Sequence, residues 1–136
     1  LPKLFEGLSF RIGSYGDPAA IPASIWKTAT RRVKNRTGYT HQWRKRIGAG
    51  LKGLCMASAD SESDVSDANA KGWRTFRVRK HDSPTLANES VCPASKEGGQ
   101  RVQCDTCGLC QGATIAARNI VIADHGLMDA RRRAVT

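Results

Sequence analysis

The chain has 136 residues, of which 40% are hydrophobic and 25% charged, and its formal net charge at pH 7 is +10. This length and composition predict one soluble globular domain with a buried core and exclude a disordered chain. The apolar runs are too short to span a membrane, and no charged start precedes an apolar stretch, so we expect neither a membrane anchor nor a signal peptide. The excess of Lys and Arg favours an anionic partner, nucleic acid first or another phosphate-bearing ligand, over a basic surface without a role.

The first elements predicted along the chain are a strand and a basic helix. Apolar and polar residues alternate over residues 8–12, which is typical of a strand, and a loop with two glycines follows. Pro22 suits the first position of a helix because its φ is already fixed near the helical value. Ile25, Ala29 and Val33 recur every four residues, so we expect this helix to bury them and to expose a basic opposite face.

The middle of the chain predicts two strands and a well-delimited helix. Gly38 should end the first helix, and residues 39–43 then predict a short strand. The small apolar residues 54–59 predict a strand that is covered on both faces. Ser61, with an acidic residue three positions later, indicates the start of a helix that should stop near Gly72.

Three further strands are expected over residues 73–79, 90–92 and 119–123. Strands that alternate with helices predict an α/β fold, with a mostly parallel sheet of about six strands and crossover helices. A closed barrel of this type has eight strands, so we expect an open sheet or an incomplete barrel. The single domain should span residues 1–136 and include a metal-binding loop at 92–112 and a basic tail at 129–136.

Four of the five cysteines lie in two short motifs. Cys92 belongs to the motif C-P-A-S, and Cys104, Cys107 and Cys110 follow with two residues between each. Four thiolates that converge on one point are the ligand set of a tetrahedral zinc ion or of an iron–sulfur cluster. An odd number of cysteines in clustered spacing also favours a reducing compartment over a disulfide framework. We therefore predict a metal centre at the end of a strand, whereas Cys55 is expected to be a buried thiol.

The spacing of these cysteines favours a [4Fe–4S] cluster, with Zn²⁺ as the alternative. A zinc site usually takes its ligands as two separated pairs, whereas three of these cysteines stand at two-residue gaps and the remote one precedes a proline. This combination resembles the cluster-binding run of bacterial ferredoxins. It departs from that run because no fourth cysteine follows Cys110 and because the Cys-Pro pair comes first.

Polar residues follow several of the predicted strands, at the edge where parallel α/β folds carry their sites. Asp17, His41 and His125 are the candidates for catalysis there, since a carboxylate or an imidazole can serve as an acid, a base or a ligand. The alternative is that these groups are ordinary polar residues of loops. Candidates for anion binding are Arg31, Arg44, Lys45, Arg77 and Arg79, although alternating arginines on a strand can also form surface ion pairs.

The chain resembles a set of phage- and plasmid-borne proteins over most of its length. The resemblance is carried by residues 16–20, 37–44, 54–60, 72–79, 91–95 and the Cys104 to Cys110 run. It implies a mobile-element origin and the cytoplasm of a bacterial host, but no established activity. Related proteins look as though they carry another cysteine cluster upstream, as in radical-SAM-type barrels. The resemblance therefore implies the later part of such a barrel or a derivative of it, and radical chemistry does not carry over.

Three hypotheses for function follow from the sequence. The first is a metal-cluster α/β protein that engages nucleic acid or another anionic partner. The second is an enzyme, radical-SAM-like or metal-dependent, that acts at the carboxyl ends of the strands. The third is a metal-stapled structural module of a larger assembly.

Overall fold

The computed structural model describes residues 2–13, 16–80 and 82–123 and shows an α/β fold with one six-stranded, all-parallel open sheet. The strands are β1 (Ser9–Ile12), β2 (Asn35–Thr40), β3 (Met56–Ala59), β4 (Thr75–Arg79), β5 (Glu89–Val91) and β6 (Asn119–Ala123). Their order across the sheet is β1-β2-β3-β4-β6-β5, so β6 lies between β4 and β5. The predicted α/β class with a parallel sheet is confirmed.

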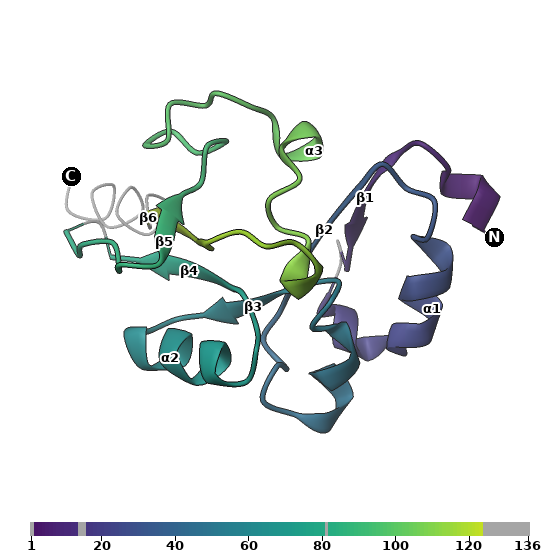
Figure 1. The fold of residues 1–136 in the computed structure, drawn as a ribbon, viewed down its shortest axis with the longest axis horizontal. Helices are drawn as coiled ribbons and strands as arrows, with labels where there is room; N and C mark the ends of the chain where they lie inside the picture. Colours follow the sequence, from purple (N-terminus) through teal and green to yellow (C-terminus); the bar gives the residue numbers. More distant parts are fainter. Residues whose placement is uncertain (1, 14–15, 81, 124–136) are drawn as a thin grey trace, which may run out of the picture.

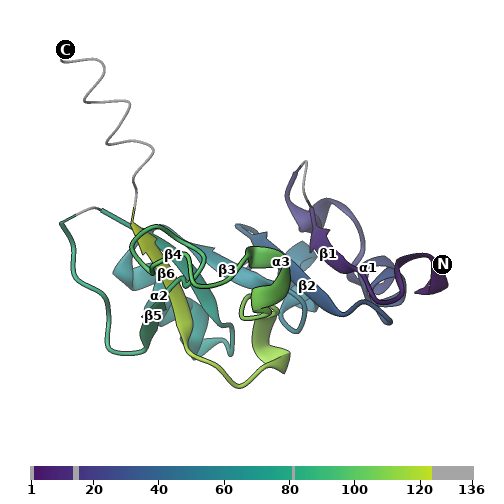
Figure 2. The same ribbon diagram turned by 90° about the horizontal axis from the view of Figure 1, so that it is seen from above.

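The helices are short and connect the strands. The α-helices are α1 (Ala23–Ala29), α2 (Glu62–Ala70) and α3 (Cys104–Cys107), and the 3₁₀ helices are η1 (Pro2–Phe5), η2 (Pro18–Ala20), η3 (Arg46–Leu51) and η4 (Gly112–Thr114). In Figures 1 and 2, α1 and α2 lie on one face of the sheet, and the chain from β5 to β6, with α3, crosses the other. We call residues 92–118 the cysteine loop.

The helix-covered face carries the larger apolar core. Its fully buried centre includes Leu51 from η3, Cys55 and Ala57 beside or within β3, and the side chains of Trp43 and Trp73, which are each 4% exposed. These residues come from connections and strands alike, because a parallel sheet buries the face on which its crossovers pack. The face beneath the cysteine loop carries a smaller apolar cluster, described below with the site.

The second helix begins and ends where the sequence predicts. The Ser61 hydroxyl accepts a hydrogen bond from the Asp64 backbone N–H at 3.1 Å, which satisfies one of the free donors of the first turn. At the other end Gly72 has φ +83°, a conformation that costs glycine little. Local capping signals alone therefore locate this helix.

The prediction for the first helix is wrong in its length and in its buried face. The helix ends at Ala29, and Thr30 follows it with its hydroxyl donated to the Trp26 carbonyl at 2.7 Å, so Val33 lies outside the helix. Ile25 is 49% exposed, because the helix turns Trp26 and Ala29 toward the core instead. A bulky tryptophan decides which face packs, and a four-residue repeat of smaller residues does not.

The strand predicted at 39–43 is also displaced, because β2 spans Asn35–Thr40. Trp43 lies beyond the strand, where its indole N–H donates to the Ser58 carbonyl at 2.9 Å. Gly38 lies inside β2 and does not simply end a helix, since a Cβ there would lie 2.7 Å from the Cys55 sulfur. The close approach of a neighbouring side chain explains a glycine in this strand.

Candidate metal centre

The cysteine loop is attached to the sheet at both of its ends. Near its start, the Glu97 carboxylate accepts hydrogen bonds from the Ala123 backbone N–H at 2.8 Å and from the Arg79 guanidinium at 2.6 Å. Near its end, the Ala113 N–H donates to the Lys52 carbonyl at 2.9 Å. These contacts place Cys104, Cys107 and Cys110 between two anchored segments, and Cys92 lies before the first of them.

Arg74 holds the last part of the loop and is a residue whose role the sequence did not reveal. Its guanidinium donates to the carbonyl oxygens of Gly112, Ala117 and Arg118 at 3.0, 3.0 and 2.7 Å. The side chain is 7% exposed, and burial lowers its pKa, while the nearby Cys110 sulfur works in the opposite direction. A planar group with five N–H donors suits this task better than an ammonium.

Gly112 sits where the loop meets the backbone of the helix-side connection. It has φ +77°, and a Cβ there would lie 2.7 Å from the Lys52 carbonyl oxygen and 2.8 Å from the Cys55 nitrogen. Both the positive φ and the close backbone contact require glycine at this position. The loop can therefore approach β3 only because no side chain is present.

Two of the other predicted ligands, Cys92 and Cys104, act electrostatically on Cys110. Cys110 is 8% exposed and belongs to an apolar cluster with Met56 and Ile120, against which Cys92 and Tyr39 pack. The Cys92 and Cys104 sulfurs are close enough to Cys110 for their charges to influence it, and the Tyr39 hydroxyl hydrogen-bonds the Cys110 sulfur. The remote cysteine that follows β5 and one other cysteine of the clustered run thus both affect Cys110.

The electrostatics of this group favour neutral thiols at the most buried position. Burial raises the pKa of Cys110 to about 12, with Cys92 and Cys104 adding to the rise, while the Tyr39 hydrogen bond and Arg74 reduce it. Burial also raises the pKa of the Tyr39 hydroxyl well above its usual range. A positive ion would reverse this preference, because metal ligation requires the thiolate.

The fourth predicted ligand, Cys107, lies three residues after Cys104 on the single turn of α3. Residues three apart in a helix share one side of it, and Gly108, with φ +70°, turns the chain toward Cys110. Within residues 2–13, 16–80 and 82–123, no three His, Cys, Asp or Glu side chains form a group that could hold a metal ion. The charges of Cys92 and Cys104 act on Cys110, but the structure does not arrange these thiols as a ligand set.

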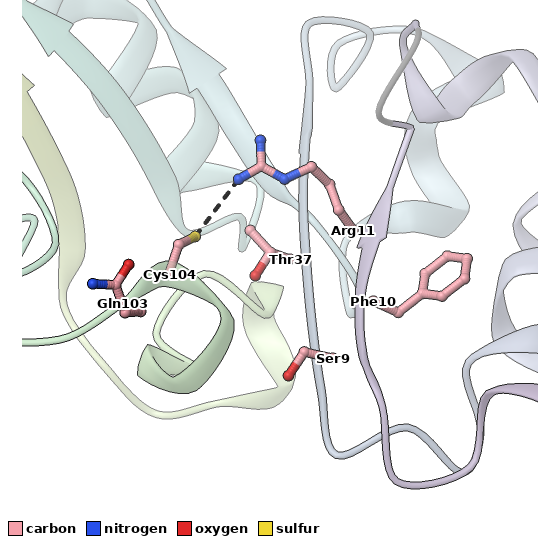
Figure 3. Close-up of a pocket in the computed structure, with 6 residues that line it drawn as sticks. All are labelled: Ser9, Phe10, Arg11, Thr37, Gln103 and Cys104. Atoms are coloured by element: carbon pink, nitrogen blue, oxygen red, sulfur yellow. Dashed lines mark hydrogen bonds between the residues drawn. The ribbon is translucent and has the colours of Figure 1, made fainter.

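A cavity of about 350 Å³ opens beside Cys104, between α3 and the first two strands. Figure 3 shows Arg11 extended from β1 across this cavity, with its Nη2 3.6 Å from the Cys104 sulfur. Thr37 from β2 and Gln103 before α3 line the same space. The cavity therefore combines a thiol, a guanidinium and neutral polar groups.

Asp17 and His41, two of the catalytic candidates, meet each other after β1 and β2. The Asp17 carboxylate accepts hydrogen bonds from the Ala19 N–H at 2.9 Å, the Thr40 hydroxyl at 2.7 Å and the His41 N–H at 2.8 Å. Partial burial raises the Asp17 pKa, but these bonds and the nearby His41 outweigh that effect and leave it lowered. The Asp17 carboxylate therefore connects the segment that follows β1 to the end of β2 by hydrogen bonds. His125 and the predicted basic tail lie outside the described residues.

The predicted anion-binding residues are scattered, and three of them already bind carboxylates. Arg77 and Glu89 form a buried bidentate pair, with N–O distances of 2.8 and 2.7 Å. Arg79 pairs with Glu97, and Arg44 pairs with Asp64 and Asp67. Arg77 and Arg79 thus place guanidinium donors in contacts within the fold, and binding of an external anion by these residues stays a prediction. Arg31 and Lys45 are exposed.

No helix within the described ranges is both long and apolar enough to cross a membrane. Comparison with known proteins found no matching family model, no matching curated protein and no matching solved structure.

Proposed function

We propose that this chain is a metal-binding α/β protein whose cysteine loop holds a [4Fe–4S] cluster, with Zn²⁺ as the alternative, and that it engages nucleic acid as its anionic partner. The observation that supports the proposal is that Cys92 packs against the apolar cluster that contains Cys110, and that Cys92 and Cys104 both act on the pKa of Cys110. Cys92 and Cys104 are twelve residues apart in the chain, so the fold, and not sequence proximity, places both where they act on Cys110.

The residues around the thiols suit a metal centre in three ways. Cys107 follows one turn after Cys104, so a modest movement of the four-residue helix α3 would bring a fourth thiolate to the group. Arg11 and Arg74 supply positive charge near Cys104 and Cys110, which favours a cluster that carries net negative charge with its four thiolates. Met56, Phe76 and Ile120 shield one side from water. A bound cluster would supply electron transfer or a structural staple.

The test is the metal content of protein expressed and purified without oxygen. The [4Fe–4S] form predicts about four irons and four sulfides per chain with broad absorbance near 400 nm, whereas Zn²⁺ predicts one zinc and a colourless protein. Replacing any one of Cys92, Cys104, Cys107 and Cys110 with Ala should reduce the metal content. The matched control is Cys55→Ala, which removes a thiol from the helix-covered face. Folded protein that takes up neither metal, even after reconstitution, would refute the proposal.

A second candidate, a metal-dependent enzyme, is favoured by the cavity beside Cys104. A guanidinium next to the thiols could anchor a small anionic substrate there. Inorganic phosphate should then raise the melting temperature of the wild-type chain but not that of Arg11→Gln. Lys3→Gln removes an exposed charge outside the cavity and serves as the control. Equal shifts in all three proteins would exclude an anion site at Arg11.

A further inference from the structure

A second cavity, of about 280 Å³, lies on the helix-covered side of the sheet and is lined mainly by positive charge. Its lining residues are Trp43, Arg44, Lys45, Arg46, Ala49, Lys52, Lys71 and Trp73. Five of these eight residues are Lys or Arg and none is acidic. Five like charges around one small space raise the local potential and favour an anion there. We call this space the tryptophan cavity.

Part of the tryptophan cavity is already fixed in position by internal contacts. The Lys52 ammonium donates to the Lys71 carbonyl oxygen at 2.8 Å, and Lys52 thereby bridges η3 and the end of α2. The Arg44 guanidinium lies 3.9 Å from the centre of the Trp43 ring and binds Asp64 and Asp67 from outside the lining. Ordering these side chains in advance lowers the entropy cost of binding a ligand.

The tryptophans make the cavity's wall rather than a stacking platform. Trp43 and Trp73 are each only 4% exposed, and the Arg44 guanidinium covers the Trp43 ring. A nucleic-acid base therefore has no free aromatic face in this cavity on which to stack. The recognition that remains is charge-based and independent of base identity.

We propose that the tryptophan cavity binds a phosphate of a nucleic-acid backbone, with Lys45 and Arg46 as the principal contacts. This inference rests on the nucleic-acid part of the proposed function and names the surface that the nucleic acid would contact. Lys45 and Arg46 are exposed, whereas Arg44 is occupied by carboxylates and Lys52 by a carbonyl. A polymer is favoured over a single phosphate compound because the whole chain has a net charge of +10, so a repeating backbone can interact with more of this charge than one phosphate can.

The experiment measures binding of a fluorescent 20-base-pair DNA duplex of arbitrary sequence by anisotropy, from 50 to 200 mM salt. The test variant is Lys45→Gln/Arg46→Gln, and the matched control is Lys3→Gln/Lys80→Gln, which removes the same charge from exposed positions outside the cavity. We expect the test variant to bind roughly tenfold more weakly at the lowest salt. Its slope of log K against log salt should fall by about 0.9, since Lys45 and Arg46 share one phosphate contact and each lost phosphate contact accounts for about that much.

Each outcome has a separate meaning. Wild-type binding with equal losses in both double variants would overturn the cavity as the site while leaving a nucleic-acid partner intact. No wild-type binding at 50 mM salt would overturn the partner itself. Stabilisation of the wild type by inorganic tripolyphosphate, without DNA binding, would assign the cavity to small polyphosphates and overturn the proposal. The metal content of Lys45→Gln/Arg46→Gln should equal that of the wild type, which separates this site from the cysteine loop.

Discussion

The two faces of the sheet are held by different forces. On the helix-covered face, Leu51, Cys55 and Ala57 are fully buried in a core of apolar side chains. On the other face, the cysteine loop is held mainly by polar contacts from Arg74 and Glu97, above a small apolar cluster. Apolar burial is insensitive to small movements, whereas hydrogen bonds from single side chains are lost entirely when one group is removed. The first face should therefore set the stability of the fold, and the second should respond to ligands.

The largest expected effect comes from breaking the buried ion pair between Arg77 and Glu89. Their side chains are 4% and 0% exposed, so Arg77→Met leaves an uncompensated buried carboxylate and should lower the free energy of unfolding by roughly 3–5 kcal/mol. Chemical denaturation measures this change. The double variant Arg77→Met/Glu89→Leu removes both charges and should recover most of the loss; if it is no more stable than the single variant, packing and not charge explains the effect.

Leu51→Ala tests the apolar face directly. Leu51 is fully buried, and its truncation should destabilise the fold by about 2–5 kcal/mol through lost burial and a residual cavity. The cysteine loop is attached near this position through the Lys52 backbone, which the Leu51→Ala substitution leaves in place, so metal content per folded chain should remain that of the wild type. A loss of metal from folded Leu51→Ala protein would show that the two faces are coupled.

Arg74→Gln tests the polar face in the same way. The variant loses charge-assisted hydrogen bonds to three carbonyls of the cysteine loop, and one such bond contributes about 1.5–3 kcal/mol. We expect a smaller loss of global stability than for Leu51→Ala, because the loop can open and let water solvate its carbonyls. Hydrogen exchange of residues 112–118 should accelerate strongly, while exchange in β3 stays slow. Equal acceleration in both segments would contradict separate responses of the two faces.

The hydrogen bonds of Asp17 at the ends of β1 and β2 should make the free energy of unfolding fall at acidic pH. Its pKa is lower in the folded chain than the unperturbed value of 3.8, so its contribution is complete above that value and is lost as pH falls through the folded pKa. Asp17→Asn should destabilise the fold by about 1 kcal/mol at pH 7 and weaken the pH dependence below 4. An unchanged acid profile of unfolding in Asp17→Asn would refute the assignment.

The smallest effect is a difference in the rate at which two buried thiols are labelled. Burial raises the pKa of Cys55 on the helix-covered face, and that of Cys110 under the loop, to about 12 in each case. Iodoacetamide at pH 8 should therefore modify both slowly in the metal-free chain. Cys110 should react first, because opening the loop exposes it, whereas Cys55 requires global unfolding. Mass spectrometry of the labelled peptides measures the order, and the reverse order would contradict the comparison.

Local signals in the sequence were sufficient for the fold class and for some boundaries. The Ser61 cap, the apolar residues 54–59 and the apolar run over 120–123 each act within a few residues, and α2, β3 and β6 lie there. The strand β2 was misplaced because Asn35–Thr40 has little apolar character. Its polar side chains are accommodated by distant partners, such as Gln111, whose side-chain amide donates to the Asn35 side-chain Oδ1 at 3.3 Å. A local residue pattern cannot predict contacts with residues so far away in the sequence.

The candidate site was predicted less completely than the fold. The spacing of the cysteines pointed to Cys92, Cys104, Cys107 and Cys110, but nothing in the spacing indicated that Arg74 and Tyr39 would adjoin Cys110. Arg77 looked like a ligand for an external anion because its partner, Glu89, lies twelve residues away on another strand. Ion pairs of this kind depend on strand order, which local sequence does not encode.

The order of the strands has a consequence for synthesis on the ribosome. β6 lies between β4 and β5, so the last strand of the sheet to emerge is one of its inner members. Until residues 119–123 leave the exit tunnel, β5 has no neighbour with which to pair, and the flank of β4 stays open. During this time the cysteine loop must stay out of the position between β4 and β5 that β6 will take. Premature closure of β5 onto β4 is thus the misfolding event against which this topology must be protected.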